Sequence, residues 1–255
     1  MTIELLEQQI SQLNYDARET ARKLGKVALP TLLKRFQTKS TRERAIVLRC
    51  LAEVKEDEAI RVLVRALQDD EPEVWNTALV LLHTAHSPVA IKPLTELLSQ
   101  SPHPLIRGEI ARILGRMGAV STLPAIKDQA QKESNPGAAQ KMDLAIAKFE
   151  DGPARWRLLE RLKNLDRKVR YQAIGDLEFV NDQKLITELL PLLNDETQVV
   201  NVGLEQWPVW HRVCDRALEA VVTLSGKSLP FPTGKRTYTP EQIQKAREVI
   251  LRMGK

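Results

Sequence analysis

The 255-residue sequence has few aromatic residues and no long apolar run. Aromatic residues make up 4% of the chain, which predicts an aliphatic, alanine-rich core of closely stacked helices. No apolar run approaches the roughly 20 residues that a membrane-spanning helix needs. The first 20 residues also lack a basic region followed by an apolar one, so we expect no secretory signal peptide and no membrane partner.

Cysteines and strand signals are equally scarce. Cys50 and Cys214 lie far apart in the sequence, with no metal-binding or redox motif around them. Such usage is typical of a reducing compartment, so we predict a cytoplasmic protein. The sequence shows no alternation of apolar and polar residues with period two and no Asn-Gly turn, which favours an all-α fold.

Sequence signals for chemistry are missing too. The chain contains no phosphate-binding glycine loop, no G-x-G-x-x-G turn and no ordered Ser, His and Asp set. His83 and His86 are three residues apart, a spacing that can hold a metal, but no further ligand completes the set. We therefore expect a protein without catalytic residues, metal or cofactor. The net charge of +5 is compatible with an acidic partner without requiring one.

What the sequence does contain is a repeat of 31 to 32 residues. One position, at the start of the second helix of each expected helix pair, recurs at intervals of 32, 31, 31, 32 and 31 residues. It is occupied by Pro30, Val62, Pro93, Pro124, Trp156 and Thr187. A position in the first helix recurs with the same period at Arg44, Trp75, Arg107, Ala139 and Arg170. Such a period predicts stacked helix pairs, each burying its apolar face against its neighbours.

The predicted fold is a right-handed α-solenoid (an alpha–alpha superhelix) of about six to seven helix pairs. We expect a single domain over residues 1–255, with an N-terminal cap pair at 1–38 and regular repeats at 40–195. The period breaks after residue 195, where Cys214 follows Arg170 by 44 residues. Residues 196–255 are therefore expected to form an irregular C-terminal repeat with an insertion loop and a final helix.

The repeated residues resemble a known unit. Asp166, Val169, Arg170, Ala173 and Leu177 match a first-helix pattern in which Val-Arg-x-x-Ala follows an Asp and precedes a Leu. Ile106, Arg107, Leu114 and Gly115, followed by Pro124, match it again. Over residues 16–225 the chain thus resembles the short HEAT-like, armadillo-like repeats of phycobilisome-lyase-type proteins and of many bacterial helical-repeat scaffolds. Trp75 and Ala139 depart from the pattern, so we expect no continuous ladder of Asp–Arg pairs.

The resemblance implies how the two helices of each pair are used. The arginines of the first helices are expected to brace the repeats, with Asp166 as the expected partner of Arg170. The second helices are expected to line the concave face and to bind another protein, an acidic one being favoured. The candidate contacts are Arg61, Arg65, Lys92, Lys127, Arg157, Arg161, Trp207 and Trp210. Trp207 and Trp210, in the insertion, form either an apolar lid on the last repeat or an exposed anchor.

Three functions stay open at this point. A non-catalytic scaffold or adaptor is the leading hypothesis, because an extended helical surface is what such arrays present. The resemblance also implies a phycobilin lyase-like or phycobilisome-handling protein as one alternative. A HEAT-like DNA-alkylation-repair glycosylase or other nucleic-acid binder is the other. The glycosylase is not favoured, because no Asp or Glu can be placed between the side chains of Trp75 and Trp156. A platform for single-stranded nucleic acid is not favoured, because no aromatic residues interleave with the basic ones. The sequence does not define the oligomeric state.

Overall fold

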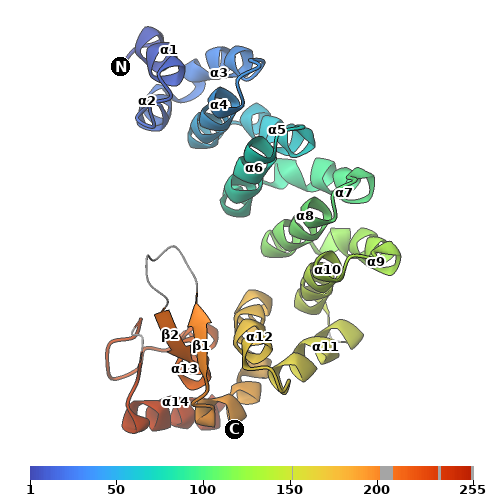
Figure 1. Cartoon of the computed structure of the whole chain (residues 1–255), viewed down its shortest axis with the longest axis vertical. Helices are drawn as coiled ribbons and strands as arrows, with labels where there is room; N and C mark the ends of the chain where they lie inside the picture. The colour runs from blue at the N-terminus through green and yellow to red at the C-terminus, as the bar shows by residue number, and fades with distance from the viewer. Residues whose placement is uncertain (151, 202–208, 235–236, 254–255) are drawn as a thin grey trace. The chain divides into compact units, whose positions relative to one another are not determined.

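The computed structural model describes residues 1–150, 152–201, 209–234 and 237–253. These residues form two compact units, Met1–Ala145 and Ile146–Lys255. In the first unit, helices that follow one another along the chain pack in pairs (Figure 1). The helices are α1 (Ile3–Ser11), α2 (Ala17–Leu24), α3 (Leu29–Arg35), α4 (Thr41–Val54), α5 (Asp57–Arg65), α6 (Pro72–Ala85), α7 (Ile91–Gln100), α8 (Pro104–Arg116), α9 (Leu123–Lys132) and α10 (Pro136–Phe149). The predicted all-α repeat fold is confirmed.

The helices of the first unit form two layers. The first helices of the pairs, α2, α4, α6 and α8, pack against one another in one layer. The second helices, α3, α5, α7 and α9, form the other. A first helix and its second helix enclose the aliphatic core, in which Leu48, Leu63 and Leu114 are fully buried. Displacement of a helix in one layer would therefore expose the apolar face of the helix that it covers in the other layer.

Local sequence sets where these helices begin. The Ser40 hydroxyl accepts a hydrogen bond from the backbone N–H of Glu43, which caps the start of α4. Pro30 and Pro124 lie in the first turns of α3 and α9, as predicted. A proline costs little there, because the first helical N–H groups have no partner within the helix. Gly108 allows close packing of α8 on α10, since a Cβ at this position would lie 3.0 Å from Ala138 Cα.

The second unit is less regular. It contains α11 (Pro153–Leu162), α12 (Arg167–Val180), 3-10 helices at Gln183–Leu189 and Pro191–Asn194, α13 (Val213–Ser225) and α14 (Pro240–Met253). α12 packs between α11 and α13, and α14 packs on α13. The final helix begins as expected. The hydroxyl of Thr239 accepts from the N–H of Gln242, whose side chain accepts from the Thr239 N–H.

The insertion contains a short β-hairpin that the sequence signals did not indicate. Strands β1 (Gln198–Asn201) and β2 (Val209–Arg212) pair antiparallel, with Val199 opposite His211 and Val200 opposite Trp210. Each strand has four residues, too few to show a period-two pattern in the sequence. Among the described residues, no helix is both long enough and apolar enough to cross a membrane.

The two-layer packing predicts a contrast within α8. Leu114 is fully buried, so Leu114→Ala should lower the free energy of unfolding by about 2–5 kcal/mol, because the removed side chain leaves a cavity. Leu105 lies on the same helix but is 46% exposed, so Leu105→Ala should change it by less than about 0.5 kcal/mol. Urea unfolding followed by circular dichroism measures both. Equal losses in the two variants would contradict the assigned packing.

Candidate partner-binding surface

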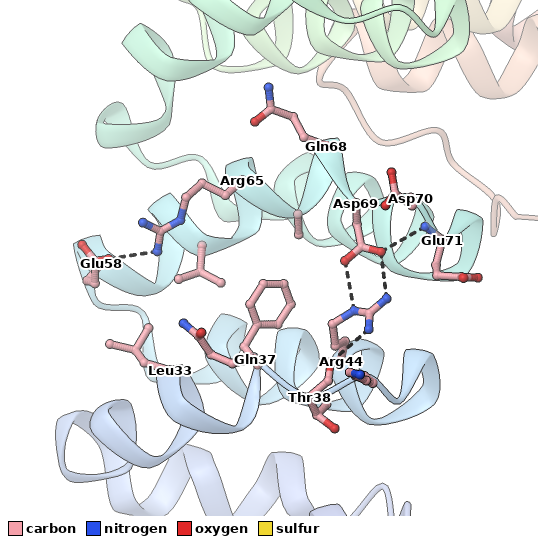
Figure 2. A pocket seen from close by; sticks show the side chains of 14 residues that line it. Leu33, Gln37, Thr38, Arg44, Glu58, Arg65, Gln68, Asp69, Asp70 and Glu71 are labelled. Carbon is pink, nitrogen blue, oxygen red and sulfur yellow. Dashed lines mark hydrogen bonds and ion pairs between the residues drawn. The ribbon is translucent and has the colours of Figure 1, made fainter.

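Arg44 joins the loops on either side of its own helix pair. Its Nε and Nη2 atoms donate to the Asp69 carboxylate at 3.0 and 2.9 Å, and its Nη1 donates to the Thr38 carbonyl at 3.0 Å (Figure 2). Asp69 in turn accepts from the backbone N–H of Glu71 at 3.0 Å. One arginine thus fixes the loop before α4 and the loop after α5, with a planar fork that suits a carboxylate.

The same clamp recurs two repeats further along, and again two repeats after that. Arg107 donates to Glu133 at 2.7 and 2.9 Å and to the Ser101 carbonyl at 2.8 Å. Arg170 donates to Asp195 at 2.7 Å and to the Asn164 carbonyl at 2.6 Å. The predicted bracing role of these arginines is confirmed. It follows that this column is part of the framework and not a ligand site.

The prediction that Asp166 pairs with Arg170 was wrong. The Asp166 carboxylate accepts from the backbone N–H of Lys168, so it caps the start of α12 instead of binding the arginine. In the repeat between the first two clamps, Trp75 replaces the arginine and stacks on His103, with ring centroids 6.4 Å apart. The ladder is therefore interrupted, as expected.

Charged residues of the first helices also bind across helices. Glu109 of α8 accepts from His83 of α6 at 2.9 Å and lies 2.7 Å from Lys141 of α10. Burial alone would raise the pKa of Glu109, but the hydrogen bonds from His83 and Lys141 and the charge of Arg112 outweigh it. The pKa falls to about 2, so the carboxylate stays ionised and ties three first helices together.

The second-helix layer presents a groove between α5 and α7, with a volume of about 470 Å³. Arg61 and Arg65 line it from α5, and Lys92 and Glu96 line it from α7; all four are exposed. Four apolar residues, Val64, Val89, Pro93 and Leu97, and two glutamines, Gln68 and Gln100, complete the lining. Of these, Val64 and Leu97 are nearly fully buried and close the bottom of the groove. We call this feature the α5–α7 groove.

Within the described part of the chain, Arg61 and Arg65 form ion pairs only with a residue of their own helix. Glu58 lies 3.2 Å from Arg65 and 3.6 Å from Arg61, measured between side-chain oxygen and nitrogen atoms. Arg65 also lines a second hollow of about 930 Å³, between α3 and α5, in which Leu33 and Gln37 face the Glu58–Arg65 pair (Figure 2). Unlike the clamp arginines, Arg61 and Arg65 are therefore available to a partner from outside.

Comparison with known proteins agrees with this architecture. Residues 29–99 match a family model of HEAT repeats. The complex of CpcE and CpcF of phycocyanin lyase from Nostoc sp. PCC7120 is similar in structure, with a TM-score of 0.56 and 17% identity. The match covers 99% of this chain and 95% of that chain. This protein is a HEAT-like repeat protein.

More distant similarities add nothing to the assignment. Human deoxyhypusine hydroxylase in complex with glycerol has a TM-score of 0.39 and 17% identity, with 98% of this chain and 95% of that chain covered. At these identities the likeness concerns the fold alone. No curated protein is significantly similar in sequence to the chain.

The other predicted contacts that the structure describes lie outside the α5–α7 groove. Lys127 of α9 and Arg157 of α11 are exposed. Arg161 of α11 is partly buried and forms an ion pair with Asp176 of α12. Trp210, on β2, is 51% exposed, whereas Trp207 lies outside the described residues. The structure thus brings together three of the eight candidates, Arg61, Arg65 and Lys92.

Sequence reasoning missed Glu58 and the apolar bottom of the groove. Glu58 lies three residues before Arg61 and seven before Arg65, a helical spacing that signals such pairs. The residues that line the bottom come from two repeats, and only the stacking of α5 on α7 brings them together. Cys50 and Cys214 are not candidate nucleophiles, since burial raises the pKa of their thiols to about 12 and about 11.

The Glu109 interactions predict a pH dependence of stability. The pKa of Glu109 is lowered from 4.5 to about 2, which corresponds to about 3 kcal/mol of stability above pH 5. This contribution should be lost as the pH falls from about 4.5 through 2. Glu109→Gln should therefore destabilise the protein by about 3 kcal/mol at pH 7 and flatten the pH dependence of unfolding between pH 5 and 2. The exposed Glu7→Gln is the control, and a similar effect of both substitutions would contradict the assignment.

Proposed function

We propose that this HEAT-like repeat protein is a non-catalytic scaffold or adaptor that binds another protein through its second-helix layer. The observation that carries the proposal is the α5–α7 groove, where exposed Arg61, Arg65 and Lys92 surround an apolar bottom. A desolvated apolar centre with a charged rim is the usual composition of a protein–protein interface. The basic rim favours an acidic partner, and a cytoplasmic location is part of the proposal.

The contrast between the two layers supports this choice. Charges of the first helices bind across repeats, as Glu109 does with His83 and Lys141. Among the residues that the structure describes, Arg61 and Arg65 pair only with Glu58, which lies on the same helix as both arginines. A partner that binds the groove therefore does not have to break an interaction that holds the repeats together.

Affinity capture from the native cell lysate tests the proposal. The immobilised protein should retain a discrete protein at moderate salt, and the double variant R61Q/R65Q should retain at least about tenfold less of it. The double variant R42Q/K168Q is the control, because it removes two exposed positive charges that lie on first helices. Capture of no protein, or equal capture by both variants, would contradict the proposal.

A phycobilin lyase-like function is the second candidate. It is favoured by the similarity to the CpcE and CpcF complex of phycocyanin lyase, which extends over nearly the whole of both chains. Addition of an open-chain tetrapyrrole should then give a saturable change in its visible absorption in the presence of the protein. An unchanged spectrum would remove this candidate. Retained nucleic acid with a steep salt dependence would instead favour phosphate binding.

A further inference from the structure

We propose that the α5–α7 groove binds a short acidic segment of the partner, and that a carboxylate of this segment displaces Glu58 from Arg61 and Arg65. This inference rests on the proposed scaffold function and specifies the chemistry of its partner. In the free protein, Glu58 lines the neighbouring hollow and pairs from that side with both arginines, so it competes with a ligand carboxylate for the same guanidinium groups. Glu58 is thus an internal competitor of the ligand.

Because the side chains of Arg61, Arg65 and Glu58 are exposed, displacement of Glu58 costs little free energy. Arg61 and Arg65 are 54% and 64% exposed in their side chains, and Glu58 is 39% exposed. Ion pairs between exposed side chains contribute little to stability, because water and salt screen them. A guanidinium carries five N–H donors, and the only hydrogen bond of the Arg65 side chain within the described residues goes to Glu58. Both arginines can therefore turn to an incoming carboxylate.

Charge directs an acidic segment to this groove and not to the neighbouring hollow. The α5–α7 groove has three basic side chains and one acidic side chain, that of Glu96. The hollow between α3 and α5 has four acidic residues and three basic ones. One of those basic residues, Arg44, is already engaged by Asp69. Of these two hollows, the α5–α7 groove is therefore the one complementary to carboxylates.

The size and lining of the groove define the segment further. α5 has nine residues, so it is about 14 Å long, which matches about four residues of extended chain. Val64 and Leu97 form an apolar bottom between the basic walls. The fitting ligand is a short segment with an apolar side chain between acidic ones. The apolar side chain lies on Val64 and Leu97, and the carboxylates face Arg61, Arg65 and Lys92.

Substitution of Glu58 by Gln tests the proposal, because removal of the competing negative charge should strengthen binding. The probe is an unlabelled, end-blocked peptide Glu-Glu-Leu-Leu-Glu-Glu, measured by titration calorimetry at low salt with the full-length protein. Glu58→Gln should bind it about two- to fivefold more tightly than the wild type, a range set by the strength of an exposed ion pair. R65Q should weaken binding about tenfold, and the peptide with every Glu replaced by Gln should not bind.

Asp57→Asn is the matched control for Glu58→Gln. Asp57 lies in the same first turn of α5, is exposed, and forms no ion pair with either arginine. The variant therefore changes the net charge equally and leaves the competitor in place. Equal affinities of the two variants for the peptide would mean that only net charge matters, and this result would overturn the proposal. Absence of binding of the peptide to the wild type would also overturn it.

If affinity capture still yields a partner that R61Q/R65Q loses, the scaffold function stands and only the acidic-segment proposal fails. If no partner is captured, the scaffold function itself fails.

Discussion

Each helix pair of this protein buries its aliphatic face only against its own two helices and the neighbouring pairs. Leu48, Leu63 and Leu114 are fully buried in this way, and no pair could bury them alone. For the pairs to stack, the loops that connect them must be held in fixed positions. The clamps of Arg44 and Arg107 provide this, because each arginine binds a carbonyl before its helix and a carboxylate after its pair.

Two glutamates of the first unit, Glu109 and Glu58, consequently differ in what they connect. In the first-helix layer, Glu109 connects α6, α8 and α10, so its ionisation is tied to the stability of the array. In the second-helix layer, Glu58 pairs with arginines of its own helix and connects no other element. Glu58 and the two arginines of α5 can therefore exchange partners while the fold stays intact. A surface for binding is thus expected at α5 and α7, and not at a second helix such as α3, whose Arg35 pairs with Glu43 of α4.

Much of this architecture could be predicted from the period of the sequence, because stacking repeats the same contacts every 31 to 32 residues. Pro30, Pro124 and the clamp arginines follow directly from it. The acidic partners were harder to find, because Asp69 and Glu133 lie 25 and 26 residues after their arginines. The β-hairpin has strands of four residues, too short to show a period, and the α5–α7 groove exists only once two repeats are stacked.

The central claim is that the second helices α5 and α7 bind the partner. Hydrogen exchange of the full-length protein, alone and with the protein obtained by affinity capture, tests it most directly. The account predicts that binding slows exchange in residues 57–68 and 88–100 and leaves the first helices α4, α6 and α8 unchanged. Slower exchange confined to the first helices or to the hairpin strands, with no change in α5 and α7, would contradict it.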